Sequence, residues 1–462
     1  MLRIRVVLLL GMFVAVTLLS GRPVWAQTGS ITGQVLDPAG SVIPNATVTA
    51  TSGSTGVSQT VTTSSAGLYN FATLPPAVYT VSATATGFAT VTKNNVTLNI
   101  AATLPLNFNL AVGAASTTVN VAGVTAAPIE TDSSQLSTVI DAKQINNLPL
   151  VLRDPYQLVL LSPGAIKSTN NDGGFSVNGQ RDRNNNFLLD GADNNDTSVP
   201  GIPSGLVNAN PDSAQEFRVI TNNFDAEFGR NTGAIIDVVT RGGTNTFHGG
   251  AYEFGRYNAL GARDYFNSKA NGPQDPYVRN DFGASVGGPI LKDKLFFFLN
   301  GEVQRFRTTR TDNQVVPNAA FKTGVFTYNS PDGSSTPVNL NNPAGNPNNL
   351  SGLGIDPTMA KLLAITPVGQ QDLGDGVSTL LFFPSPDALN DYTLTGRLDY
   401  AINPKHQLTV RYTYGHSAES NPAHSEVLPG IGFYDNTQTA HNGSISLAST
   451  LSSSITNLVR AS

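Results

Sequence analysis

The amino-acid sequence predicts a mainly β protein, and three observations support that prediction. Polar and apolar residues alternate in short segments separated by turn residues, which is typical of strands with one buried face. Gly (44 residues) and Pro (28 residues) are frequent, as many tight turns require. Charged residues make up only 13% of the chain, against about 25% in an average soluble domain. The composition therefore indicates a turn-rich, exported β chain rather than a helical one.

Residues 1–26 have the parts of an export signal. Two arginines near the start precede an apolar run at residues 6–19, and Val24 and Ala26 stand at the −3 and −1 positions of a small-residue cleavage site. The apolar run is shorter than the roughly 20 residues that a membrane-spanning helix needs. We therefore expect cleavage between Ala26 and Gln27, which makes Gln27 the mature N-terminus.

Composition also limits how the protein is held and what it binds. The chain has no cysteine, so it has neither a disulfide framework nor a lipid attached to cysteine. Its net charge of −5 gives no basic field for nucleic acid, so no nucleic-acid partner is expected. Transmembrane β-strands are short and alternate in polarity, so the lack of a second long apolar segment does not exclude a β-barrel.

Residues 27–112 have the pattern of a small β-sandwich. Alternating segments lie at residues 30–35, 46–51, 57–63 and 78–83, with turn residues between them. Short strands that alternate in this way, with a turn every eight to twelve residues or so, are typical of sandwiches.

The order of motifs in this domain closely resembles the carboxypeptidase-regulatory-like domain. A first strand ends in G-x-V, an Asp-x-x-Gly turn follows, and then come Pro-x-Ala-x-Val, G-x-Y-x-F and Y-x-V-x-A-x-x-x-G-F segments. The matching residues are Gly33, Asp37, Gly40, Pro44, Ala46, Val48, Gly67, Tyr69, Phe71, Tyr79, Val81, Ala83, Gly87 and Phe88. We interpret them as core and turn positions. Carbohydrate binding is the alternative that the wider fold family offers, but no exposed aromatic platform is evident.

Residues 113–244 carry a second set of motifs. The apolar segment 187–189 is closed by the turn pair Asp190-Gly191, and residues 214–249 read AQEFRVITNNFDAEFGRNTGAIIDVVTRGGTNTFHG. This order closely resembles the plug domain of TonB-dependent outer-membrane receptors of the Oar-like kind. The resemblance implies an α+β plug domain.

In that family, a short extended segment ahead of the plug pairs with a TonB-type periplasmic energy-transducing protein. The best candidate in this sequence is the segment Thr118, Val119, Asn120, Val121 and Ala122. Strand addition uses main-chain groups and needs little side-chain identity, so an ordinary linker strand is the alternative interpretation.

Residues 245–462 resemble the first strands of an Oar-like β-barrel. Residues 279–307 predict a hairpin, and residues 392–402, 406–415 and 437–450 predict further strands. The barrel implies contact with outer-membrane lipid.

The aperiodic stretch 308–390 is expected to be a long extracellular loop with a short helix near residues 359–365. We count about six or seven spanning strands. Because an incomplete antiparallel transmembrane β-barrel would leave unpaired edges in lipid, the chain is expected to be part of a longer protein.

We find no catalytic, cofactor-binding or metal-binding site in the sequence. The five histidines (His248, His406, His416, His424 and His441) lack the spacing of a helical metal pair. The acidic stretch 190–196 fails the EF-hand pattern, and we interpret it as a solvated turn. The run Arg181-Asp182-Arg183 is expected to be an exposed face, although plug arginines can pair with barrel carboxylates.

The sequence therefore predicts a non-enzymatic TonB-dependent receptor or transporter in the outer membrane of a Gram-negative-type bacterium. The N-terminal domain and plug would face the periplasm, and an unidentified extracellular ligand would cross the membrane. The alternative is a passive outer-membrane, adhesion or carbohydrate-binding protein with the same fold and no energy coupling.

Overall fold

The computed structural model describes most of the chain after the predicted export signal. The described residues are 28–100, 102–113, 117–120, 134–150, 152–168, 174–196, 207–225, 228–229, 231–262, 276–341, 355–420, 435–452 and 455–462. The export signal and its cleavage site at Ala26 and Gln27 lie outside them.

The N-terminal domain is a sandwich of two sheets. One sheet has the order β4-β1-β7, with β8 also paired to β1, and the other has the order β3-β2-β5-β6-β9. The strand bounds are β1 Gly29–Leu36, β2 Thr47–Ser52, β3 Ser58–Thr62, β4 Leu68–Leu74, β5 Ala77–Thr84, β6 Val91–Leu98, β7 Thr103–Pro105, β8 Phe108–Asn109 and β9 Thr117–Asn120. Alternate residues of each main strand point inward, so that Val48, Phe71 and Val81 are buried in one core. The sandwich prediction is confirmed.

The second part of the chain is a mixed sheet with short helices. Its strand order is β10-β15-β16-β13-β14, and β13 runs parallel to β16. The bounds are β10 Leu136–Asp141, α2 Ala142–Asn147, η1 Pro155–Leu161, β11 Ala165–Lys167, β12 Phe175–Val177, η2 Asp182–Asn184, β13 Asn186–Leu189, β14 Ala192–Asp193, β15 Ala214–Asn222 and β16 Ile235–Thr240. Every residue of β16 is buried, and Asp141 starts α2 with a capping box to Gln144. This is the α+β plug that the sequence predicts.

The third part is one antiparallel sheet of long strands. Its order is β17-β18-β19-β23-β24-β25-β26, with β22 at the side of β23. The bounds are β17 His248–Tyr257, η3 Asn258–Leu260, β18 Tyr277–Leu291, β19 Leu295–Pro317, β22 Gln371–Asp372, β23 Ser378–Asn403, β24 His406–Ser420, β25 Asp435–Thr450 and β26 Thr456–Ala461. Neighbouring strands join in sequence, and β17 and β26 form the two ends of the sheet. The predicted open barrel sheet is confirmed.

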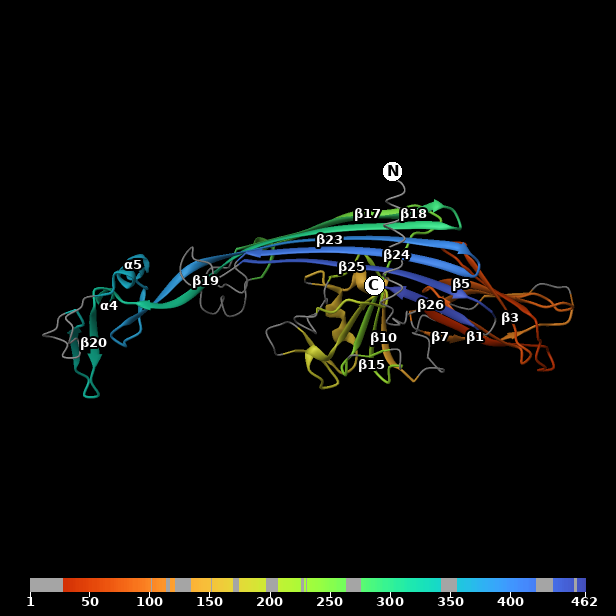
Figure 1. Ribbon diagram of the computed structural model, residues 1–462, viewed down its shortest axis with the longest axis horizontal. Helices are drawn as coiled ribbons and strands as arrows, with labels where there is room; N and C mark the ends of the chain where they lie inside the picture. The colour runs from red at the N-terminus through yellow and green to blue at the C-terminus, as the bar shows by residue number, and fades with distance from the viewer. Residues whose placement is uncertain are drawn as a thin grey trace, which may run out of the picture.

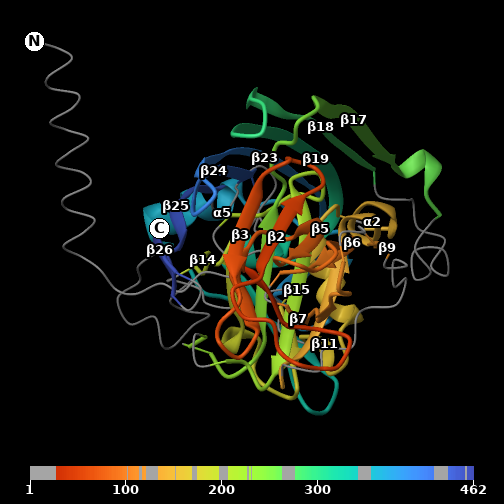
Figure 2. The ribbon, with the colours of Figure 1, turned by 90° about the vertical axis from the view of Figure 1, so that its right-hand side faces the viewer.

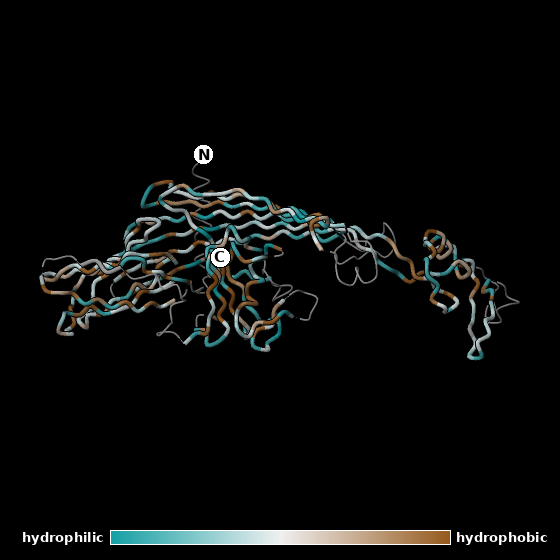
Figure 3. The backbone as a smooth tube through the Cα atoms, turned by 180° about the vertical axis from the view of Figure 1, so that it is seen from behind, coloured by the Kyte–Doolittle hydropathy of each residue, from teal (hydrophilic) through white to brown (hydrophobic). Residues whose placement is uncertain are grey.

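Side chains alternate across this sheet between an apolar outer face and a polar inner face. On β19, Leu299 is 52% exposed, whereas Asn300 beside it is 4% exposed. On β24, Tyr412 is exposed between the buried Arg411 and Thr413. Figure 3 shows how hydropathy varies along these strands. Apolar-out and polar-in alternation is the pattern of a transmembrane β-barrel.

The prediction of an aperiodic loop over residues 308–390 is wrong in part. Strands β19 and β23 extend beyond the rest of the sheet and stay paired out to Pro317 and Ser378. Their far end carries α4 Ala319–Lys322, β20 Val325–Asn329, β21 Ser335–Asn339 and α5 Pro357–Ile365. We call the segment from α4 to α5 the distal lobe. It projects from one end of the long strands (Figure 1), and α5 confirms the predicted short helix.

The plug lies against the inner face of the barrel sheet, and the sandwich lies at the end opposite the distal lobe (Figures 1 and 2). The sandwich end is also the end of the short turn between β18 and β19. No helix in the described part of the chain is long and apolar enough to cross a membrane.

Candidate functional site at the plug–barrel interface

The plug and the barrel sheet meet through two groups of charged side chains with opposite polarity. In the Arg153 cluster (Arg153, Asp212, Tyr252, Phe254 and Glu302), the plug supplies the cation that faces a barrel carboxylate. The Asp190 cluster (Asp190, Asp237, Thr240, Arg397 and Arg411) has the reverse arrangement, because the plug supplies the anion and the barrel supplies two arginines.

Arg153 sits just before the helix η1 and adopts a left-handed backbone conformation (φ 51°). Its Nη2 atom lies 2.5 Å from Asp212 Oδ2 in the plug and 3.3 Å from Glu302 Oε2 on β19. The guanidinium carbon lies 4.6 Å from the ring centre of Tyr252 and 4.1 Å from that of Phe254, both on β17. These aromatic faces attract the cation where it has lost most of its water.

The charge state of this cluster is well defined. Burial alone would lower the pKa of Arg153, but the carboxylates of Glu302 and Asp212 outweigh burial, so its pKa is raised. The Tyr252 hydroxyl donates a 2.6 Å hydrogen bond to Glu302 Oε2. Arg153 therefore stays charged and holds two barrel strands, β17 and β19, through its partners.

Two further contacts flank the Arg153 cluster. Arg279 on β18 donates from Nη2 to the carbonyl of Leu152 at 2.8 Å, and Asn210 Nδ2 of the plug donates to Asn300 Oδ1 of β19 at 2.6 Å. The contacts between plug and barrel on this side are thus charged or polar.

Asp190 occupies the turn that follows β13, with φ 50°. Its Oδ2 atom lies 2.9 Å from Arg411 Nε on β24, and its Oδ1 atom lies 3.4 Å from Arg397 Nη1 on β23. Thr240 donates to the same carboxylate from its backbone N–H at 2.9 Å and its hydroxyl at 2.8 Å. Burial alone would raise the pKa of Asp190, but the two arginines and these hydrogen bonds outweigh it and lower the pKa.

Arg411 connects this turn to a third barrel strand. Its Nη2 atom donates to the Leu189 carbonyl at 3.3 Å and to Asn442 Oδ1 on β25 at 2.6 Å. Asn442 in turn donates from Nδ2 to the carbonyl of Asp193 and to Asn194 Oδ1, both at 3.0 Å. Both ends of the β13–β14 turn are therefore held by the barrel.

A second carboxylate, Asp237 on β16, lies beside the Asp190 turn. Its Oδ1 atom accepts from the Gly191 N–H at 3.1 Å, whereas its Oδ2 atom has no hydrogen-bond partner among the residues that the structure describes. Burial, aided by the negative charge of Asp190, raises the pKa of Asp237 to about 7. Asp237 is therefore partly protonated near neutral pH, which reduces the repulsion between the two carboxylates.

This arrangement holds the plug against the barrel sheet through charged and polar contacts. Contacts between charged and polar groups can be exchanged for contacts with water when the plug moves, whereas a large apolar interface would expose hydrophobic surface. Removing one partner of a buried ion pair typically costs about 3–5 kcal/mol, because the other charge is left uncompensated. The two clusters therefore have the properties of latches.

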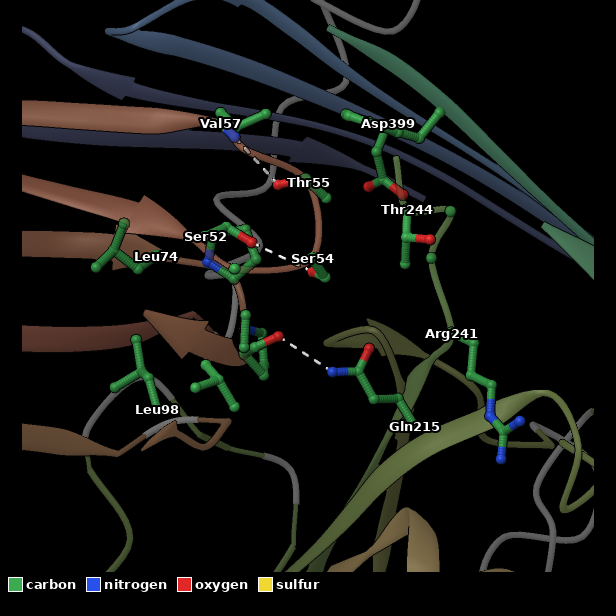
Figure 4. A pocket seen from close by; sticks show the side chains of 18 of the residues that line it. Ser52, Ser54, Thr55, Val57, Leu74, Leu98, Gln215, Arg241, Thr244 and Asp399 are labelled. Atoms are coloured by element: carbon green, nitrogen blue, oxygen red, sulfur yellow. Dashed lines mark hydrogen bonds between the residues drawn. The ribbon is translucent and has the colours of Figure 1, made fainter. Parts of the chain in front are cut away.

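A cavity of about 560 Å³ lies where the sandwich, the plug and the short-turn end of the barrel meet (Figure 4). Gln215 of the plug donates to the Pro76 carbonyl of the sandwich at 3.1 Å. Asn245, which leads into β17, donates from its backbone to the Ser54 carbonyl at 3.0 Å and from its side chain to the Thr55 carbonyl at 2.6 Å. The sandwich is thus joined to both other parts.

A second junction between sandwich and plug is formed around Ile100, two residues after β6. The backbone N–H of Ile100 donates to the Glu216 carboxylate, and its carbonyl accepts from Arg218, both on β15. Arg218 also donates to Ser137 Oγ on β10 at 2.9 Å. Burial raises the pKa of Glu216 to about 7. We call Ile100, Glu216 and Arg218 the Ile100 junction.

The predicted partner-binding segment lies only partly within the described residues. Thr118, Val119 and Asn120 belong to β9, which pairs in parallel with β6 at the edge of the sandwich. Val121 and Ala122 lie outside the described residues.

Other predicted sites have plain structural roles. The interpretation of residues 190–196 as a solvated turn is wrong, because Asp190 is paired with barrel arginines. Asp182 is buried and accepts from Ser168, whereas Arg181 and Arg183 are exposed. His424 lies outside the described residues, and no group of three potential metal ligands occurs within them.

Sequence reasoning missed the barrel side of both latches, although a local signal was present. Arg279 with Asp281, and Arg397 with Asp399, are charged pairs two residues apart in predicted strands. Such residues share one face of a strand, and in a membrane barrel that face must be the lumen. The pattern identifies the lumen face but not the plug partner.

The comparisons with known proteins agree with this architecture. Residues 239–462 match the outer membrane beta barrel domain family, and residues 30–111 match the carboxypeptidase regulatory-like domain. The TonB-dependent transporter Oar of Myxococcus xanthus is 33% identical over 325 residues, which cover 66% of this chain and 29% of that protein. The chain thus spans less than a third of this curated relative.

Solved outer-membrane receptors are similar over a comparable stretch. The transporter YddB from Escherichia coli has 12% identity and a TM-score of 0.42, over 68% of this chain and 37% of its own. The ferric enterobactin receptor of Pseudomonas aeruginosa has 13% identity and a TM-score of 0.43, over 70% and 39%. From the domain matches and the 33% identity to Oar, the chain belongs to the Oar-like TonB-dependent receptors of the Gram-negative outer membrane.

Proposed function

We propose that this protein is an energy-coupled gate that moves an extracellular ligand across the outer membrane. The observation that supports this most strongly is the plug inside the barrel sheet, held by two charged latches rather than by an apolar core. Such a plug blocks the lumen at rest and can be displaced without unfolding the barrel.

The working cycle follows from the arrangement of the three parts. The ligand would first contact the distal lobe and the outer ends of the barrel strands. A TonB-type protein in the periplasm would then pair with the segment at residues 118–122 and pull. The pull would separate Arg153 from Glu302 and Asp190 from Arg397 and Arg411, and water would enter to solvate the separated charges.

Binding of the periplasmic partner tests this proposal directly. Proline lacks a backbone N–H and interrupts strand pairing, so Val119→Pro should weaken binding of a purified TonB-type periplasmic domain at least tenfold. Ala126→Pro, placed beyond the segment, should bind like the wild type. If the wild-type protein binds no such domain, the passive or adhesion alternative replaces energy coupling.

A further inference from the structure

The candidate partner-binding strand is part of the sandwich rather than a free linker. In β9, residues Thr117–Asn120 pair in parallel with Val91–Asn94 of β6. In the described part of the chain, β6 is the only strand that pairs with β9, so β9 forms one edge of the five-stranded sheet. Figure 2 shows β9 beside β6 on the flank of the sandwich.

An edge strand offers unpaired N–H and C=O groups along its outer side, which is a template for another strand. A segment already ordered on β6 has lost its conformational entropy before a partner arrives. A partner strand would therefore bind β9 more tightly in this position than as a flexible linker.

Strand β6, which pairs with β9, also leads into the plug. Strand β6 ends at Leu98, and Ile100 then contacts Glu216 and Arg218 on β15. Strand β15 pairs with β16, which carries Asp237 and ends at Thr240, a hydrogen-bond donor to Asp190. A continuous set of backbone pairs and hydrogen bonds thus connects the sheet edge to the Asp190 latch.

We propose that the sandwich presents β9 as an edge strand to which an extended strand of the TonB-type protein adds, and that β6 passes the pull to the plug through the Ile100 junction. This inference rests on the proposed function and gives the carboxypeptidase-regulatory-like domain a part in energy coupling. The partner is recognised by main-chain pairing, because the strand TTVN carries no charge.

A disulfide lock tests the first half of the inference. The chain has no cysteine, so Thr92→Cys with Thr118→Cys, which face each other in the register, should crosslink on oxidation. Thr92→Cys with Asn120→Cys is the mismatched control and should crosslink poorly. The oxidised matched pair should bind the TonB-type periplasmic domain as tightly as its reduced form, or several-fold more tightly.

The outcomes separate the possible failures. A tenfold or greater loss of binding on oxidation would overturn the proposal that the sandwich presents β9 to the partner. The segment would then have to leave β6 before it binds. Poor crosslinking of the matched pair would overturn the docked position of β9. If the matched pair crosslinks well but neither form nor the wild type binds the domain, the proposed energy coupling itself is wrong.

The second half is tested at the Ile100 junction. Glu216→Gln keeps the shape of the side chain and removes its charge, and the Ile100 junction lies away from β9, so partner binding should be unchanged. In energised cells, the labelling rate of a Ser213→Cys reporter, which is buried in the resting plug, measures plug displacement. This rate should fall several-fold in Glu216→Gln. An unchanged labelling rate would mean that the pull bypasses β6.

Discussion

At the scale of single residues, the plug–barrel interface depends on a few side chains whose neighbours fix their charge. Asp190 and Arg153 are each paired with groups from both the plug and the barrel. Because each side chain lies among partners of opposite charge, replacing either with a neutral residue leaves charged partners without a counter-charge. The effects of substitution should therefore be large and local.

Asp190→Asn should loosen the plug. Without the carboxylate, the fully buried Arg411 loses its ion-pair partner, at a cost of about 3–5 kcal/mol. Arg397 keeps Asp399 at 2.9 Å and is affected less. The free energy of plug unfolding in urea, followed by labelling of a buried plug cysteine, measures this loss. The exposed Asp193→Asn should change it by less than about 0.5 kcal/mol, and equal effects of the two would contradict the latch.

The stability of the plug should fall as the pH rises through 7. Burial raises the pKa of Asp237 to about 7 in the folded plug, well above the value of 3.8 expected when unfolded. Its stabilising contribution is complete below pH 3.8 and is lost progressively as the pH rises from 3.8 through the folded pKa of about 7. Between pH 5 and pH 8 the loss is on the order of 3 kcal/mol.

Asp237→Asn should remove this part of the dependence. Glu216, whose pKa is also raised to about 7, would still contribute in the same direction, so the slope of unfolding free energy against pH should fall by about half. Urea titrations of wild type and variant at several pH values provide the slope. An identical slope would show that Asp237 is ionised throughout.

At the scale of elements, turns decide how the three parts fit together. Gly56, in the β2–β3 turn, has φ +71°, and a Cβ there would lie 2.4 Å from Asp293 Oδ1 in the β18–β19 turn. Asp293 also accepts from Asn245 at 2.6 Å. The sandwich therefore approaches the barrel turn so closely that a side chain at position 56 would force the Asp293 carboxylate to move.

Gly56→Ala should loosen the sandwich from the barrel more than Gly40→Ala does. Both glycines have positive φ, so each alanine pays about 1–2 kcal/mol of backbone strain, but Gly40 has no atom within 4 Å of the added Cβ. Hydrogen exchange at Asn245 and Asp293 should accelerate at least tenfold only in Gly56→Ala. Similar acceleration in both variants would mean that strain alone matters.

Strands and turns with a regular local pattern were predictable, whereas partners distant in sequence were not. The hairpin at residues 279–307 and the turn after Asn403 follow from alternation and turn residues. The sequence around Asp190 indicates only a solvated turn, because its partner Arg397 lies 207 positions further on. No local pattern records that contact.

Two strand extensions were missed for a different reason. The outer parts of β19 and β23 are rich in Thr, Asn and Pro, and at this height β24 has not yet begun to pair with β23, which it does from Ala388. These outer parts do bury alternate residues, and Val316, Leu381 and Phe383 form a small core there. The consecutive apolar residues 380–383 and the prolines that follow them hide this alternation in the sequence. Similarly, β9 is a four-residue strand that pairs in parallel with a distant strand, and local sequence shows only a polar, β-prone linker.

At the scale of the whole molecule, the outer face of the barrel sheet is its membrane-contacting surface. Leu299 and Leu394 are exposed on that face, at 52% and 57%. Val315 is similarly exposed, at 62%, on the same strand as Leu299 but near the distal lobe. In the proposed topology, Leu299 faces lipid and Val315 faces extracellular water.

Leu299→Arg should impair membrane assembly, whereas Val315→Arg should not. An arginine facing the middle of a bilayer costs about 2–4 kcal/mol in a β-barrel, and this cost falls toward zero at the interfaces. The fraction of protein recovered in the outer membrane measures assembly. Equal recovery of both variants would show that Leu299 does not face lipid.

The opposite polarity of the two latches also bears on how the plug is seated during folding. Arg153 meets Glu302 on β19, and Asp190 meets Arg397 and Arg411 on β23 and β24. A plug turned so that its two charged groups exchanged places would set Arg153 against Arg397 and Arg411, and Asp190 against Glu302. The charges therefore favour one rotational setting of the plug within the barrel over the exchanged one.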